Sequence, residues 1–231
     1  MSGQLRVLIE EAPKGKRWVA IAADWPGLER NGKSEEEAVE KLRAYLPRYR
    51  AVARRARLGA ELERQQDVQV VARHTGTGST DFWGISFAPS AEDRAPIDDA
   101  TFERRLALLR AAWAEFDEVA DRVSPDLRPG PRGGGRSRDE IIGHALRVES
   151  LDFAKRVKVP EPAEWEELLP AKGRAAHRDQ FVEAIREWRA ADKPLGKWTV
   201  LYLLRHSAYH VLDHAWEMED RDLTGQPAAD G

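Results

Sequence analysis

Residues 205–221 read RHSAYHVLDHAWEMEDR and place His206, His210 and His214 at intervals of four. Residues four apart share one face of an α-helix, so two such imidazoles can reach one ion. His206 and His214 would be separated by roughly 12 Å along the helix axis, so all three cannot bind the same ion. The stretch predicts a helix that offers one adjacent histidine pair to a metal.

The apolar face of this helix indicates which pair that is. At about 100° per residue, the apolar side chains gather on one side; they are Leu201, Leu204, Ala208, Val211, Leu212 and Ala215. His214 lies at the border of that side, His210 lies further round, and His206 lies nearly opposite. The pattern favours His210 and His214 as the inward pair and places His206 at the surface or behind a ligand. Glu217 lies near the histidine face, where it is either exposed, able to orient a ligand imidazole, or able to act as a base.

A two-histidine pair is an incomplete site, because catalytic zinc usually takes three protein ligands and keeps one position open. His144, within DEIIGHALRVESLDFAKRV, shares a helical stripe with Ile141, Val148 and Leu151 and is expected to point into the core. A single core histidine is more often hydrogen-bonded packing than a ligand. Together with the pair, it favours a metal site made of His144, His210 and His214.

The surrounding sequence from Asp98 onward has a helical period. Helices are predicted over about 101–123, 137–157, 177–191 and 198–221, and Ser137 with Glu140 forms a capping box at the start of the second. Short amphipathic helices of this kind bury their apolar stripes against one another. The C-terminal part, 98–225, is therefore predicted to be an all-α four-helix bundle.

The N-terminal part has a different pattern. LRVLIEEA and RWVAIAADW read as strands, WPGLERNGK as a loop, and Ser34 with Glu37 as the cap of a helix that Pro47 should kink or interrupt. DVQVVARH and DFWGISFA read as two more strands, which gives ββαββ up to about Ala88. The prediction is an α+β domain over 1–90, with the polar stretch PSAEDRAPIDD as the boundary.

Composition restricts the partners. The chain has 231 residues, a formal net charge of -3 and no cysteine, so it offers no thiolate ligand, and thiol chemistry would need an external thiol. This charge balance predicts neither nucleic acid nor an anionic membrane as a partner. No stretch approaches the roughly 20 apolar residues of a membrane span, and the start of the chain lacks a signal core. A cytoplasmic protein is expected.

The histidine pattern, IIGHALRVE followed by YHVLDHAWEMEDR, resembles the DinB-like four-helix bundle superfamily over roughly residues 98–222. The resemblance implies a divalent metal, most often zinc or nickel, held by His144, His210 and His214. Members include transferases that use bacillithiol or mycothiol with a small-molecule substrate, which favours a metal-dependent thiol S-transferase. The alternative is a noncatalytic protein-binding or stress-regulatory module in which the metal is structural.

The segment WVAIAADWPGLERNGKSEEEAVEKLRAYL is similar to HicB-type antitoxin domains, over about residues 5–72. That resemblance implies a partial RNase H-like fold that works by binding protein, without a DNA-binding tail in this chain. It implies docking or a homodimer, and Phe82 and Trp83 are the aromatic groups expected to anchor the contact. The alternative is that both rings complete the core of the domain.

The sequence contains three other candidate polar features, an arginine-rich stretch and two further histidines. Arg128, Arg132, Arg136 and Arg138 stand among glycines and suit either an anion contact near the site or, as the favoured interpretation, a flexible connection. His74 and His177 lie in loop-like or polar contexts without partner spacing. Neither is assigned to the site.

Overall fold

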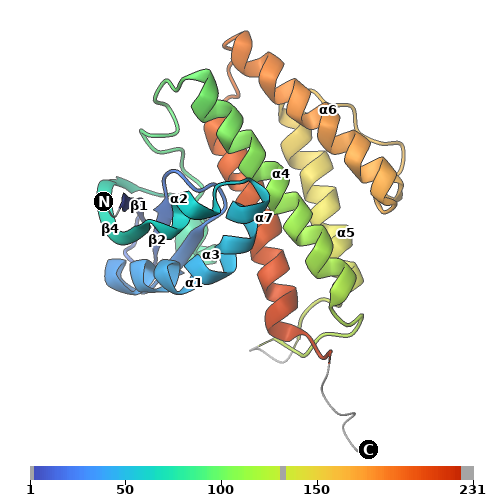
Figure 1. Ribbon diagram of the computed structural model, residues 1–231, viewed down its shortest axis with the longest axis horizontal. Coiled ribbons are helices and arrows are strands. Elements are labelled where there is room, and N and C mark those ends of the chain that lie inside the picture. Colours follow the sequence, from blue (N-terminus) through green and yellow to red (C-terminus); the bar gives the residue numbers. More distant parts are fainter. Residues whose placement is uncertain (1–2, 131–133, 225–231) are drawn as a thin grey trace, which may run out of the picture. The chain divides into compact units, whose positions relative to one another are not determined.

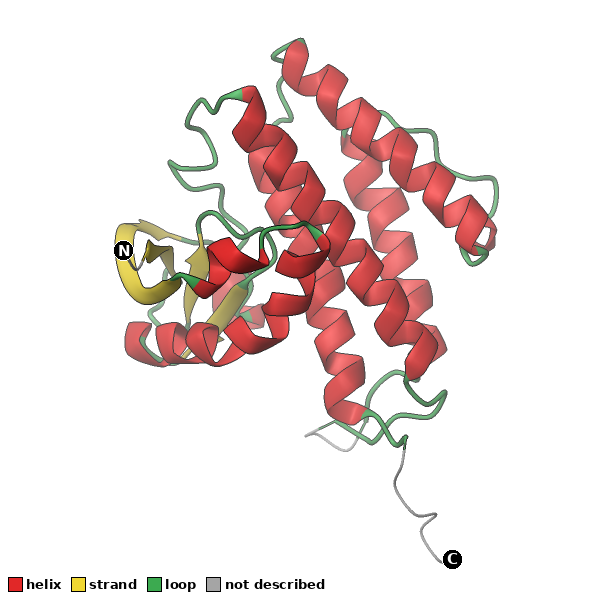
Figure 2. Cartoon of the chain, viewed as in Figure 1, coloured by secondary structure: helices red, strands yellow, loops and turns green. Residues whose placement is uncertain are grey.

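The computed structural model describes residues 3–130 and 134–224, which form an α+β protein with one sheet and several helices (Figures 1 and 2). The chain divides into two compact units. Unit 1 takes in Met1–Ala112 and Lys193–Tyr209, and unit 2 takes in Trp113–Asp192 and His210–Gly231. The boundaries fall inside α4 (Asp99–Arg122) and α7 (Val200–Arg221), so each of these helices contributes to both units. The predicted ranges 1–90 and 98–225 follow the change from strands to helices, whereas the units follow spatial contacts.

The sheet of unit 1 has the order β3-β2-β1-β4, with β1 (Gly3–Glu11), β2 (Trp18–Ala22), β3 (Glu29–Gly32) and β4 (Gln65–Thr75). The first three strands form an antiparallel meander. Helices α1 (Glu35–Arg55) and α2 (Gly59–Glu63) then return the chain to the far side of β1, so β4 pairs with β1 in parallel. Because of this crossover, β1 pairs with β2 on one side and with β4 on the other.

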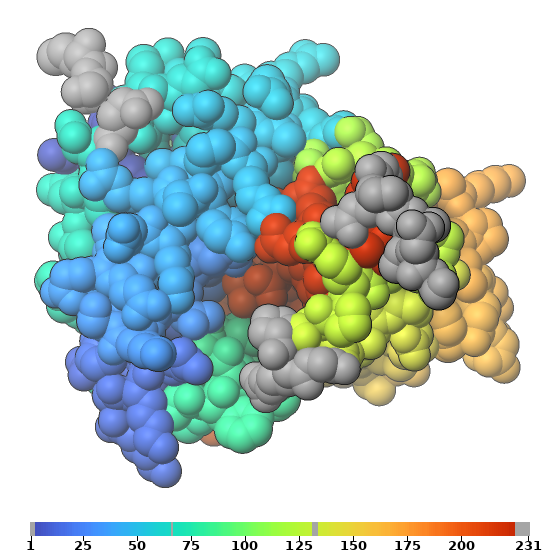
Figure 3. Space-filling model, turned by 90° about the horizontal axis from the view of Figure 1, so that it is seen from below, coloured from blue at the N-terminus to red at the C-terminus, as the bar shows by residue number. Residues whose placement is uncertain are grey.

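Helix α1 packs against β2 and β3 through its apolar stripe, which consists of Ala38, Leu42, Tyr49, Val52 and Ala53. The Ser34 side chain caps the helix by accepting a hydrogen bond from the backbone N–H of Glu37, as predicted. The opposite side of α1 faces solvent and forms part of the surface shown in blue in Figure 3. The predicted interruption at Pro47 is wrong, because the helix continues through it. Proline removes one backbone hydrogen bond, and burial of Leu42 and Tyr49 on either side holds the helix together.

Two local predictions in unit 1 are also wrong. Residues 29–32 form β3 rather than a loop, because the ladder with β2 buries Glu29 and Arg30 despite their polarity. Residues 81–88 do not form a strand: Gly78–Trp83 is the short helix α3, capped by Thr77 and Thr80 and ended by Gly84 at φ 68. In α3 the rings of Phe82 and Trp83 are 73% and 63% exposed, so they do not complete the core.

Unit 2 contains the rest of α4 and α7 together with α5 (Arg138–Val148) and α6 (Ala171–Ala190), at the four predicted positions. A π-helical turn, η1 (Glu149–Ala154), extends α5, and a 3-10 turn, η2 (Trp165–Leu168), precedes α6. The core of unit 2 is apolar and aromatic; it includes Trp113, Phe116, Ile141, Leu146, Phe181, Ile185, Leu212 and Trp216. Within the described residues, no helix combines the length and apolarity needed to cross a bilayer.

A buried ion cluster ties three elements of unit 2 together. Arg178 of α6 donates from Nε to Oε1 of Glu149 at 2.9 Å and from Nη1 to Oδ2 of Asp117 in α4 at 2.8 Å. Glu149 is the first residue of the π-helical turn and is 1% exposed. A buried carboxylate needs such a partner, and Arg178 supplies it at the residue where α5 changes to π geometry.

Candidate metal centre

Helix α5 presents His144 about two turns after Ser137, the N-cap residue of a complete capping box. Ser137 accepts a hydrogen bond from the backbone of Glu140, and the Glu140 side chain accepts from the backbone N–H of Ser137 at 2.7 Å. On the same helix, Ile141 and Ala145 are buried and His144 is partly buried. The histidine therefore lies at the edge of the apolar face rather than inside the core that the sequence stripe predicted, and Leu151 of that stripe is 42% exposed.

Helix α7 supplies His210 and His214, and the three predicted imidazoles meet. One ligand nitrogen from each of His144, His210 and His214 lies within 4.8 Å of the other two. Nε2 of His210 is 3.3 Å from Nε2 of His144. Two nitrogens bound tetrahedrally at about 2.0–2.1 Å would lie roughly 3.3–3.4 Å apart, so this pair already has the spacing of two zinc ligands. These histidines can hold a metal ion.

Glu217 orients His214. Nδ1 of His214 lies 3.0 Å from Oε2 of Glu217, and a carboxylate can only accept, so Nδ1 carries the proton and Nε2 keeps its lone pair. The hydrogen bond from His214 lowers the pKa of Glu217, burial opposes this, and Arg221, whose Nη1 donates to Oε1 at 2.8 Å, lowers it further. This is the contact by which proteins fix the tautomer of a metal-binding histidine. Of the sequence alternatives for Glu217, orientation of a ligand matches the contact.

The protonation state of His144 also suits a ligand. Burial lowers the pKa of His144 to about 4, and the charges of His214, Arg136 and Arg147 act in the same direction. The imidazole is therefore neutral at pH 7, which is the form that donates a lone pair to a metal. Phe153, from the π-helical turn, lies with its ring centroid 5.6 Å from that of His210 and makes one wall of the centre apolar.

The three remaining histidines lie apart from this cluster. Of the two predictions for His206, the surface position is wrong, because His206 is 6% exposed in unit 1 and stacks on Tyr202 with ring centroids 5.2 Å apart. The prediction considered only the one side of α7 on which apolar residues gather. The opposite side is buried as well, because the Phe87 ring packs against His206. His74 lies on β4, not in a loop, and its Nε2 is 3.2 Å from Oε2 of Glu10. His177 is buried in α6.

The arginine-rich connection before α5 contributes to the surroundings of the centre. Arg221 of α7 donates from Nη2 to the backbone oxygen of Arg136 and from Nε to that of Arg128, at 2.8 and 2.7 Å. Arg138 pairs with Asp139 at 2.8 Å. Arg132 lies outside the described residues. Because Arg221 also binds Glu217, these contacts fix the carboxylate that orients His214.

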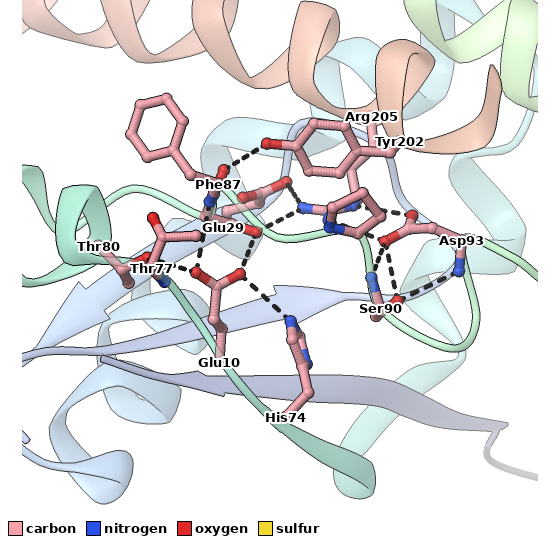
Figure 4. Close-up of polar contacts among 12 residues, drawn as sticks. Glu10, Glu29, His74, Thr77, Thr80, Phe87, Ser90, Asp93, Tyr202 and Arg205 are labelled. Carbon is pink, nitrogen blue, oxygen red and sulfur yellow. Dashed lines mark hydrogen bonds and ion pairs between the residues drawn. The ribbon is translucent and has the colours of Figure 1, made fainter. Parts of the chain in front are cut away.

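A second polar cluster, which was not predicted from the sequence, lies inside unit 1 (Figure 4). Arg205 of α7 is 1% exposed and forms ion pairs with Glu29 of β3 at 2.6 Å and with Asp93 at 2.9 Å. Charges buried to this extent are stable only when paired. Glu10 joins this cluster through the Ser86 hydroxyl, which accepts from Arg205 and donates to Glu10. Glu10, Glu29, Asp93 and Arg205 are called the carboxylate network below.

Hydroxyl groups and a histidine complete the contacts of Glu10, which is 0% exposed. Thr80 Oγ1 donates to Oε1 at 2.6 Å, Ser86 Oγ donates to Oε2 at 2.5 Å, and His74 approaches Oε2 (Figure 4). Burial opposes ionisation, but these hydrogen bonds outweigh it and lower the pKa of Glu10. Period-two alternation places Glu10 in phase with buried Leu8, which was the available sign that this carboxylate points inward.

Comparisons with protein-family models, with curated proteins and with solved structures gave no significant match to this chain. The DinB-like and HicB-like resemblances therefore stay predictions, and the site is interpreted from its own geometry.

Proposed function

We propose that this chain binds one divalent metal ion through His144, His210 and His214 and uses it to activate a low-molecular-weight thiol for transfer to an electrophilic small molecule. The observation that carries the metal is the convergence of the three imidazole nitrogens within 4.8 Å. The thiol rests on the resemblance of the histidine pattern to DinB-like proteins and on the lack of cysteine, which requires that a thiol come from outside the chain.

The donor set suits zinc or nickel. Neutral imidazoles are borderline ligands that both ions accept, and three protein ligands leave a coordination position for a small molecule. Glu217 supports this set by fixing the proton on Nδ1 of His214. Within the described residues, no fourth histidine, cysteine or carboxylate belongs to the cluster, which favours an open position over a closed structural site.

A divalent metal with an open position stabilises the deprotonated form of a bound thiol or water at neutral pH. In the transfer, the thiol loses its proton to solvent, its sulfur forms a bond to the electrophilic carbon, and the leaving group departs with the bonding pair. Phe153 excludes water from one side of the imidazoles. Glu217 already accepts hydrogen bonds from His214 and Arg221, so it positions a ligand and is not free to take the thiol proton.

One observation favours the second candidate, a protein-binding module. Phe82 and Trp83 of α3 are exposed and contact each other with ring centroids 4.5 Å apart. Exposed aromatic pairs of this kind anchor protein contacts. In that case the metal would be structural and the exposed pair would carry the activity, through a partner or a second copy of the chain.

Metal analysis of protein purified without a histidine tag tests the first step. We expect about one zinc or nickel per chain, with loss in His144→Ala and His210→Ala and no loss in His74→Gln, whose side chain keeps a donor toward Glu10. Metal retained in both alanine variants would contradict the site. Metal-loaded protein is then incubated with bacillithiol, mycothiol or glutathione and a panel of electrophiles, and absence of metal-dependent turnover with every pair would favour the binding module.

A further inference from the structure

A groove of about 390 Å³ lies on unit 2 along α5, a volume in the range of small-molecule sites. Its lining combines two cations, an aromatic ring and two acids; the residues are Arg136, Asp139, Glu140, Gly143, Arg147 and Trp165. Neither the metal cluster nor the carboxylate network includes any of them.

The groove adjoins the metal centre along one stripe of α5. Glu140 and Arg147 lie four residues before and three residues after His144, and positions at these spacings are neighbours on a helix surface. Gly143 directly precedes His144. The groove therefore neighbours His144 along α5, although His144 is not one of its lining residues.

Gly143 allows the aromatic wall to approach. A Cβ added at Gly143 would lie 3.0 Å from the Trp165 ring and 3.4 Å from Nη1 of Arg147, closer to the ring than side chains normally allow. The Arg147 guanidinium lies over Trp165 with its carbon 4.7 Å from the ring centroid. This stacking holds a planar guanidinium in place while its N–H groups remain available to a ligand.

The acids of the groove are already engaged, whereas the arginines are available. Glu140 accepts from the backbone and hydroxyl of Ser137 at 2.7 and 2.9 Å, and Asp139 accepts from Arg138 at 2.8 Å. Within the described residues, neither Arg136 nor Arg147 makes an ion pair with a carboxylate. Arg136 precedes α5 and Arg147 lies in its last turn, and both line the groove, so their two positive charges suit an anion.

We propose that this groove binds the carboxylate of the small molecule that reacts at the metal centre, with Arg147 as its main contact and Arg136 as its second. The inference rests on the proposed function for the reaction, but binding of the carboxylate does not depend on that reaction. The carboxylate belongs either to the electrophile or to the thiol, and Arg147 stacked on Trp165 recognises it in both cases through a charge-assisted pair of hydrogen bonds.

Calorimetric titration with glutarate tests the groove, with glutaramide as the uncharged probe. We expect glutarate to bind metal-free and metal-loaded protein, glutaramide to bind at least about tenfold more weakly, and Arg147→Gln to weaken glutarate by about tenfold or more, the effect of losing one charged hydrogen bond. Arg136→Gln should weaken it less. The control Arg186→Gln, an exposed arginine of α6, should change nothing, and Arg147→Gln should keep its metal and its melting temperature.

Separate results contradict the groove and the reaction. If glutarate binds Arg147→Gln as tightly as wild-type protein, the groove is not the carboxylate site. The same holds if binding requires the metal and does not change in Arg147→Gln. Neither result contradicts the metal site. Arg147-dependent binding in a protein that takes up no metal supports the groove and overturns the proposed function. Where turnover is found, electrophiles and thiols with and without a carboxylate show which reactant Arg147 holds, since only that reactant's KM rises in Arg147→Gln.

Discussion

Arg205 donates from Nη1 to Oε1 of Glu29 at 2.6 Å, although 176 residues separate them and both side chains are almost fully buried. Asp93 pairs with the same guanidinium, and the Ser86 hydroxyl, which accepts from Arg205 and donates to Glu10, links the third buried carboxyl group to it. Burial, opposed by Arg205, raises the pKa of Glu29 to about 7. Glu29 is therefore mostly protonated below about pH 7 and forms an ion pair with Arg205 above it.

Removing the cation should destabilise the protein strongly. Arg205→Met leaves Glu29 and Asp93 buried without their partner, and we expect the free energy of unfolding to fall by about 3–5 kcal/mol. Urea denaturation of the full chain measures this. Arg6→Met is the control, because Arg6 forms ion pairs with a 39% exposed side chain and should change stability by less than about 1 kcal/mol. Equal effects of both substitutions would contradict the role assigned to Arg205.

Glu29 should make stability fall as pH rises. Its folded pKa of about 7 lies above the unfolded value of 4.5, so the folded state retains a proton through this range that the unfolded state releases. Between pH 5 and pH 8 this group should reduce the free energy of unfolding by an amount on the order of 3 kcal/mol. Glu29→Gln cannot ionise and should lose correspondingly less stability over the same range.

The difference between wild-type protein and Glu29→Gln, measured by urea denaturation at pH 5 and pH 8, isolates Glu29, because every other titratable group is present in both. Lowered pKa values place the contributions of Glu10 and Asp93 below pH 5, where stability is lost as pH falls. Identical pH profiles would show that Glu29 is already ionised in the folded protein at pH 5.

Glu217→Gln should weaken metal binding without removing a ligand. The amide no longer offers His214 a charged acceptor and can present its NH₂ instead, so we expect a 10–100-fold lower affinity, at about the magnitude seen when such partners are removed. Competition with a chelator measures it. Glu219→Gln on the same helix is the matched control, because Glu219 pairs with Arg122 rather than with a histidine. An unchanged affinity in Glu217→Gln would leave the His214 contact without a function in metal binding.

The exposed rings of Phe82 and Trp83 on α3 predict a homodimer whose interface contains both rings. The double variant Phe82→Ala, Trp83→Ala should be monomeric by light scattering, while its stability as a monomer should change by no more than about 0.5 kcal/mol because both rings are mostly solvent-exposed. Leu169→Ala, another exposed apolar side chain, should leave the dimer intact. A wild-type chain that is monomeric at every concentration would contradict this prediction.

Most of the correct predictions about the helices and the candidate metal site follow from helical periodicity. The 3.6-residue pattern located α4 to α7, the capping box at Ser137, and the histidine stripes that bring His144 to His210 and His214. These features are local, or follow from the burial of one apolar side. The burial of His206 could not be predicted in this way. It results from packing against Phe87, which is distant in the sequence and does not affect the helical pattern of α7.

Features fixed by distant partners were not predictable in this way. Strand β3 is a polar four-residue stretch that becomes a strand because β2 pairs with it and Arg205 neutralises Glu29. DFWGISFA alternates like a strand, but Thr77 caps a helix there and Gly84 ends it. Glu149, at the start of the π-helical turn, is buried with Arg178 of α6 as its partner, 29 residues later in the chain. In each case, tertiary contacts outweighed a local pattern.

The position of Arg205 late in the chain has a consequence for biosynthesis. Asp93 is translated 112 residues before its partner, which at about 5–20 residues per second is an interval on the order of ten seconds. Until Arg205 leaves the ribosome, the completed sheet carries carboxyl groups that cannot be buried as ions. We therefore expect unit 1 to close only after α7 has been synthesised, and a nascent chain stalled before Arg205 to be more sensitive to proteases than the full chain.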